Sequence, residues 1–129
     1  INYNGKLVTE PFWKKESHWL RSVLDSEECR NAERRIVFCH IPPDRKGWHG
    51  NRNVSECFVP LLNEAKVDMM FSAHIHKWAL YPAGDSGTGA LFPIVVNPNR
   101  ERMEVTLCPD TVEIRTFSPD GKCTHSHRF

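Results

Sequence analysis

The sequence predicts a single domain of 129 residues, α/β in its first part and antiparallel β in its second. Short apolar runs at Ile36–Phe38 and Val67–Phe71 are typical of buried strands, and each follows a segment with helical periodicity. Apolar and polar residues alternate at Met103–Leu107 and Thr111–Phe117, as they do in half-buried antiparallel strands.

The first helix is predicted to begin at about residue 12 or 14 and to end before the polar run 25–35. Four apolar side chains recur at helical spacing and form the expected core-facing stripe: Trp19, Leu20, Val23 and Leu24. His18 lies beside that stripe and is expected on the helix surface. Residues 1–11 are polar, with a turn signal at Asn4–Gly5, and are typical of a connector.

A loop and a second helix are predicted between the two apolar strands. Residues 44–53 are rich in Gly, Arg and Asn, which indicates a surface loop. Ser55 is a suitable N-cap for a helix that runs to about Lys66. Pro60 is unfavourable in the middle of such a helix, so we expect a late start or a kink.

Strands dominate the remainder of the chain. Residues 79–81 and the β-branched run at 92–96 are expected strands. Pro109–Asp110 favours a hairpin between the two alternating strands, Met103–Leu107 and Thr111–Phe117. The tail contains a second His-x-His pair, His125 and His127. Because no apolar strand leads into it, this pair is predicted to be exposed.

Three histidines follow the two apolar strands. His40 comes after the first, where Pro42 and Pro43 stop it, and His74 and His76 come after the second. If the strands are parallel neighbours, their carboxyl ends meet at one sheet edge, where open α/β sheets carry their sites. In an extended segment His74 and His76 would face the same space. The pattern predicts a metal site formed by these three rings; the alternative is that they are solvated loop histidines.

The loop after His40 is expected at the same edge. Its Arg45 and His49 are candidates for binding an anionic substrate, because cationic side chains suit phosphate oxygens. The alternative is a solvated loop whose charges serve solubility.

These motifs resemble a known family. His40-Ile41-Pro42-Pro43 and Ala73-His74-Ile75-His76 after an apolar strand are similar to the last two metal-binding motifs of the calcineurin-like metallophosphoesterases, which include the purple acid phosphatases. The resemblance covers most of the chain but only the second half of that domain. It implies the C-terminal half of a four-layer α/β/β/α sandwich.

The chemistry implied by the resemblance is hydrolysis of phosphate esters by a dinuclear centre of Zn, Fe, Mn or Ni. Carried over by motif, His40 and His74 would bind one ion and His76 the other. The bridging carboxylate and a further histidine would come from the first half of the domain.

Two departures separate this chain from the family pattern. Ala73 stands where the family usually has Gly, and the carboxylate-bearing motifs of the first half are absent. Since the sequence also begins with Ile1, we expect a piece of a longer enzyme, inactive by itself. Such a piece would leave a sheet edge and a sheet face uncovered, which predicts self-association or pairing with the missing N-terminal half.

Composition excludes some function classes. The net charge is +1 with 26% charged residues, so nothing indicates binding to nucleic acid or to an anionic membrane. Five cysteines without metal-ligand spacing argue against a disulfide framework or zinc ribbon, and Cys39 and Cys57 are expected to be buried thiols. Neither the compartment nor the identity of the ester follows from the sequence.

A different functional class fits the same residues. The chain could be a non-catalytic, β-rich binding domain that holds at most one structural metal. The enzyme hypothesis requires carboxylate motifs upstream of this chain, whereas the binding-domain hypothesis does not.

Overall fold

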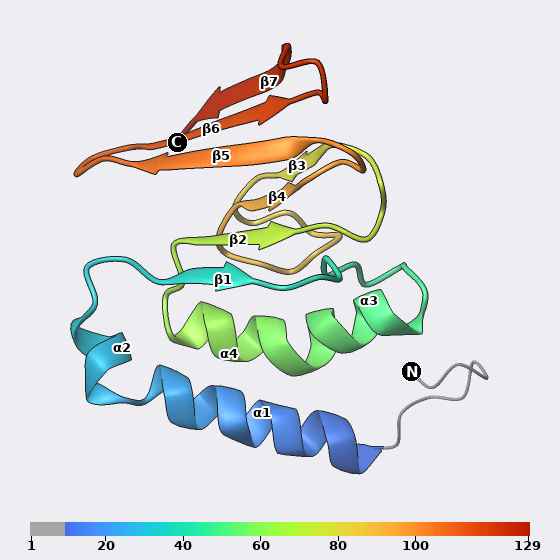
Figure 1. The fold of residues 1–129 in the computed structure, drawn as a ribbon. Helices are drawn as coiled ribbons and strands as arrows, with labels where there is room; N and C mark the ends of the chain where they lie inside the picture. Colours follow the sequence, from blue (N-terminus) through green and yellow to red (C-terminus); the bar gives the residue numbers. More distant parts are fainter. Residues whose placement is uncertain (1–9) are drawn as a thin grey trace.

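The structure, a computed structural model, describes residues 10–129 and begins with two helices (Figure 1). α1 spans Glu10–Leu24 and α2 spans Glu27–Asn31. The helix predicted after residue 12 is therefore present and begins slightly earlier. The predicted turn at Asn4–Gly5 lies outside the described residues.

Only half of the predicted apolar stripe on α1 faces the core. Leu20 and Leu24 pack against the core, whereas Trp19 is 61% exposed and Val23 is 41% exposed. Residues four apart share a helix face and adjacent residues do not, so the two pairs point in different directions. The expectation that all four side chains are covered is wrong within the described part of the chain. His18 is exposed, as predicted.

The first sheet, sheet A, has four strands: β1 (Ile36–Phe38), β2 (Met69–Ser72), β3 (Ala79–Tyr81) and β4 (Ile94–Val96). Their order is β1-β2-β4-β3, with β1, β2 and β4 parallel and β3 antiparallel to β4. The two strands preceding the histidines are parallel neighbours, so the condition for a shared sheet edge is met.

The helical segment between β1 and β2 begins earlier than predicted. α3 spans His49–Asn53, a π-helical turn (η1) spans Val54–Phe58, and α4 spans Val59–Glu64. The last five residues of the predicted loop are thus helical. Ser55 is not an N-cap: it lies inside the segment, buried, and its hydroxyl donates to the backbone carbonyl of Thr88 at 3.2 Å.

Pro60 gives a physical reason for the wide turn. Proline has no N–H, and its ring crowds the carbonyl four residues earlier in an α-helix. Just before Pro60, the N–H of Val59 donates to the carbonyl of Val54, five residues back. The helix therefore widens where the sequence predicts a kink.

The second sheet, sheet B, is an antiparallel meander of β5 (Arg102–Leu107), β6 (Val112–Phe117) and β7 (Cys123–Arg128). The predicted hairpin between the first two strands is confirmed. The tail is an edge strand paired with β6, and its sequence lacks an apolar signal because almost all its side chains are exposed.

The described elements form three layers, with the helices on one face of sheet A and sheet B on the other (Figure 1). One core cluster joins the helices to sheet A: Val59, Leu62, Val67, Met70, Ala90, Phe92 and Ile94. A second joins the two sheets: Met69, Phe71, Val95, Val112 and Ile114. The chain is thus mixed α/β with two sheets, and residues 10–129 contain no helical layer beyond sheet B.

Each sheet has an open edge beside the other. Within residues 10–129, β1 pairs only with β2, and β5 pairs only with β6.

No helix within residues 10–129 is long and apolar enough to cross a membrane.

Candidate functional site

The backbone brings two histidines together where β1 and β2 end. The parallel ladder continues past the last paired residues, because the N–H of Cys39 donates to the carbonyl of Phe71 at 3.0 Å. The N–H of Ala73 then donates to the carbonyl of His40, also at 3.0 Å. His40 is therefore held beside the segment that carries His74.

That segment is a tight turn and not an extended strand. β2 ends at Ser72, and the N–H of Ile75 donates to the carbonyl of Ala73 at 2.7 Å. This closes a γ-turn around His74, whose φ is +62°; His76 has a φ of +59°. Histidine is among the non-glycine residues that tolerate positive φ best.

The turn brings two of the three predicted ligands into contact. Nδ1 of His74 lies 3.3 Å from Nε2 of His40, so one imidazole N–H donates to the other ring. Their rings meet edge to face, with centroids 5.1 Å apart. His76 is exposed, and the expectation that it faces the same space as His74 through strand alternation is wrong, because the segment is not extended.

Aromatic contacts extend this pair into a row of four rings. Trp48 stacks on His74 with centroids 5.3 Å apart and planes 27° apart. His49 completes the row: its ring meets Trp48 edge to face, with centroids 4.7 Å apart and planes 80° apart. Trp48 lies in the segment predicted to be a surface loop that could meet an anionic substrate; its stacking on His74 depends on the fold.

The environment favours neutral imidazole at His74. Burial lowers the pKa of His74, and the nearby His40 and His76 lower that pKa further, because each disfavours a positive charge there. Neutral imidazole is the form that binds metals. Burial also raises the pKa of the Cys39 thiol, whose Sγ donates to the carbonyl of Ile41. Cys39 packs against the core, but Cys39 and Cys57 are both half-buried and not fully buried as predicted.

The two predicted substrate-binding residues are placed differently from each other. His49 is half-buried beside Trp48, and its Nε2 has no hydrogen-bond partner among the described residues. Arg45 is exposed, but its backbone N–H donates to Gly87 at 2.8 Å and its guanidinium rests against Gly89. The structure therefore places His49 against Trp48, which stacks on His74, and anchors Arg45 on the turn that contains Gly87 and Gly89.

A cavity of about 470 Å³ opens next to His40, between the two sheets. Its wall is mainly apolar, with Phe38, Phe71, Met103 and Val105. It also has polar lining residues that sequence reasoning did not single out: Ser72, Asn97, Glu101 and Arg102. The hydroxyl of Ser72 and Oδ1 of Asn97 are buried there without a described hydrogen-bond partner.

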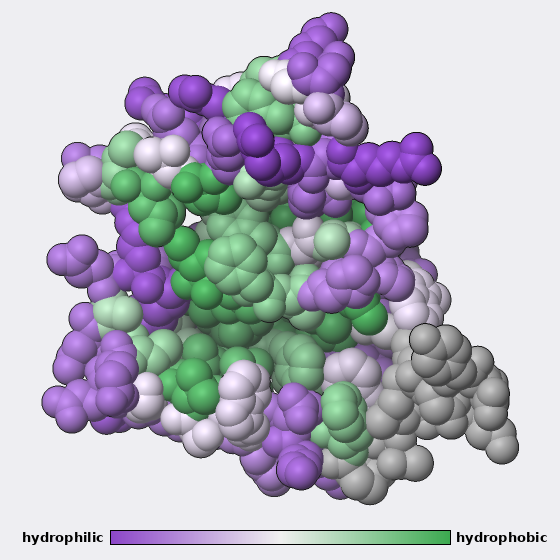
Figure 2. Space-filling view, in the orientation of Figure 1, coloured by the Kyte–Doolittle hydropathy of each residue, from purple (hydrophilic) through white to green (hydrophobic). Residues whose placement is uncertain are grey.

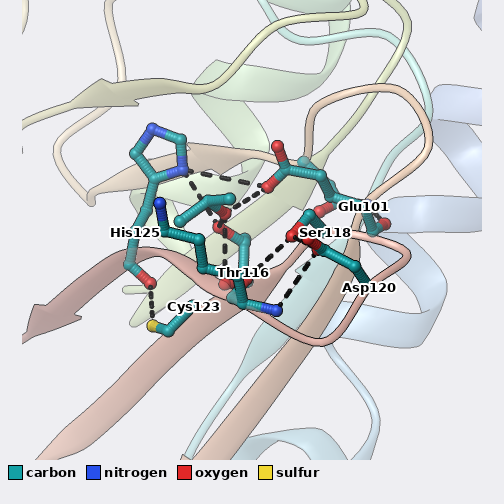
Figure 3. Close-up of polar contacts among 9 residues, drawn as sticks. Glu101, Thr116, Ser118, Asp120, Cys123 and His125 are labelled. Atoms are coloured by element: carbon teal, nitrogen blue, oxygen red, sulfur yellow. Dashed lines mark hydrogen bonds and ion pairs between the residues drawn. The ribbon is translucent and has the colours of Figure 1, made fainter.

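One member of the second His-x-His pair, His125, belongs to another polar cluster (Figure 3). His125 points toward Glu101 and Thr116, with its Nδ1 3.0 Å from the hydroxyl of Thr116. Its ring also stacks on Trp78, with centroids 4.5 Å apart. His125 is thus only half-exposed, contrary to prediction, whereas His127 is exposed as predicted.

Across residues 10–129, no group of three or more His, Cys, Asp or Glu side chains is arranged to hold a metal ion. The histidine pair is therefore the part of the predicted site that the fold assembles. No protein-family model matches the chain, and no curated protein matches it significantly.

Proposed function

We propose that this chain is the C-terminal part of a calcineurin-like metallophosphoesterase, and that the intact parent hydrolyses phosphate esters at a dinuclear metal centre. One observation carries the proposal. Two parallel neighbouring strands each deliver a histidine, and the ring nitrogens of His40 and His74 lie 3.3 Å apart. The finer assignment, half of a four-layer sandwich, rests on the sequence motifs and is part of the proposal.

The separation of the two nitrogens fits a shared metal ion. Two imidazole nitrogens bound at about 2.0–2.1 Å in a tetrahedral site lie about 3.3–3.4 Å apart. His40 would bind through Nε2 and His74 through Nδ1, so both must present lone pairs there. The hydrogen bond between the rings would then be replaced by two metal bonds, with little movement of the backbone.

The charges on the chain support a division of the site between two parts of a domain. His40 and His74 are neutral donors, and two adjacent cations held by neutral ligands alone would repel each other strongly. Carboxylates from the first half of the domain would offset that charge. His76, exposed on the same turn, remains the candidate ligand for the second ion. We therefore expect negligible turnover by the chain alone.

The bound metals would polarise the phosphoryl group and activate water. The chain's own residues would orient the site: Trp48 fixes the plane of the His74 ring through stacking. His49, behind Trp48, has a buried ring nitrogen without a partner among residues 10–129, and this nitrogen would reach a phosphate oxygen only by becoming exposed. Arg45 would reach substrate only by leaving the turn on which it rests.

The second candidate function is a non-catalytic binding domain with at most one structural metal. It is favoured by the lack of any third His, Cys, Asp or Glu at the histidine pair within residues 10–129. Upstream carboxylate motifs in the parent gene would exclude it.

Zinc calorimetry on the chain and on four variants tests the proposed site. We expect wild type to bind zinc, and His40→Ala and His74→Ala each to weaken binding at least about tenfold, since each removes one of two converging donors. His76→Ala should leave the first ion in place. His127→Ala is the matched control, because it removes an exposed histidine from the other His-x-His pair.

Hydrolysis of an aryl phosphate, measured in parallel, separates the alternatives. Zinc binding that requires His40 and His74, without turnover, supports half of a phosphoesterase site. Turnover by wild type would show that the chain is complete. Zinc binding that survives both substitutions would refute the assignment of the ligands.

A further inference from the structure

The open edges of the two sheets line one groove. Phe38 of β1 and Met103 and Val105 of β5 line the same cavity, with Phe71 at its floor. The two strands run in opposite directions along it, since Arg34, just before β1, donates to the carbonyl of Cys108, just after β5, at 2.8 Å. Figure 2 shows a hollow of apolar surface in the middle of this face.

The groove is lined by apolar side chains of the kind found in protein interiors, but no described segment of the chain covers it. Phe38 is 79% exposed, although it stacks on the buried Phe71 with centroids 5.4 Å apart. Within the described residues, the outer side of β1 and the outer side of β5 have no strand partner. β1 contains neither a Pro nor a charged residue, which commonly protect exposed edges from pairing, whereas β5 carries Arg102 and Glu104.

The charge pattern on β5 indicates that a second copy of the same strand fits its open edge. In antiparallel self-pairing centred on Met103, each Arg102 faces Glu104 of the second copy, and the pair occurs twice. Both side chains are exposed and pair with each other within the strand at 2.8 Å, and the Arg102 guanidinium also lies 5.1 Å from the ring centroid of Phe117. Pairing with a second copy would replace the contact within the strand. Opposite charges directly across an antiparallel pair are stabilising, and like charges are destabilising.

We propose that the chain forms a two-fold symmetric dimer, in which β5 pairs with β5 of a second copy and the two apolar grooves cover each other. A two-fold axis makes such contacts self-complementary and closes the assembly. The net charge of +1 opposes the approach of two copies only weakly. This inference goes beyond the phosphoesterase function. It concerns this chain by itself, because the N-terminal half of the proposed domain would compete for the same open edges.

Sedimentation equilibrium over a range of protein concentrations tests the dimer. Arg102→Glu places two acidic side chains opposite each other twice, and should raise the dimer dissociation constant about tenfold or more. The double variant R102E/E104R exchanges the charges and should return that constant to near the wild-type value. Lys122→Glu, the same charge change in an exposed turn, is the control and should have no effect.

A second variant tests the groove independently. Phe38→Lys replaces an exposed side chain, so the fold is retained, and it should also favour the monomer. Wild type that stays monomeric up to its solubility limit would overturn the proposal, as would open-ended assemblies. A double variant as monomeric as Arg102→Glu, in chains that circular dichroism shows to be folded, would overturn the β5 pairing.

Discussion

Two serines in this chain are almost equally buried but differ in their hydrogen bonding. Ser55 is 5% exposed and donates to the carbonyl of Thr88. Ser72 is 6% exposed, and its hydroxyl has no partner among residues 10–129. A buried polar group without a partner costs its desolvation free energy without compensation.

Alanine substitution at the two serines should therefore have different effects on the free energy of unfolding. We expect Ser72→Ala to leave the free energy of unfolding unchanged or raise it by up to about 1 kcal/mol, and Ser55→Ala to lower it by about 1 kcal/mol. Urea unfolding at one fixed protein concentration measures both. Equal losses would mean that the hydroxyl of Ser72 has a partner in solution.

At the histidine pair, sequence reasoning succeeded where it depended on topology. Two apolar runs ending in His40 and His74 would share a sheet edge if they formed a parallel pair, and the structure shows that pair. The same reasoning failed for His76, because it extended the strand through a segment that turns at His74. A positive φ at histidine leaves little trace in a single sequence.

At the level of elements, β7 is the strand whose sequence least resembles a strand. Its side chains are mainly polar on both faces of the strand, and it is stabilised by contacts with residues from other parts of the chain. His125 stacks on Trp78 and contacts Thr116, whereas the ring of His127 lies against Phe129, two residues further along the tail.

The two histidines of β7 should therefore contribute unequally to stability. We expect His125→Ala to lower the free energy of unfolding by about 1–2 kcal/mol through loss of stacking and a hydrogen bond. His127→Ala should lower it by less than about 0.5 kcal/mol. Thermal or urea unfolding of both variants, without metal, makes the comparison; equal effects would contradict the packing seen at His125.

The helical segment between β1 and β2 shows why boundaries are harder to predict than elements. Apolar periodicity correctly indicated a helix before Val67. Its start was misplaced because Ser55 has the chemistry of an N-cap, while Trp48, which precedes α3, makes no side-chain capping bond. Tertiary contacts around the buried Gly50 and Asn51 take the place of the capping signal.

At the scale of the molecule, the order of helices and strands was predictable because it follows from periodicity. The closing of two sheets around one groove was not, because it depends on which edges remain without partners. The exposed Phe38 illustrates this: its sequence context is that of a core strand, and only the three-dimensional arrangement reveals that one side is uncovered.

The strand order also has a kinetic consequence. In sheet B the nearest paired residues are close in sequence, as in Leu107 with Val112, whereas sheet A joins Ile36 to Met69. Closing a short loop costs less chain entropy and is faster. We therefore expect sheet B to form before sheet A during refolding, although it is the last part of the chain. Pulsed hydrogen exchange should show amides of β6 protected before those of β2; the reverse order would contradict this expectation.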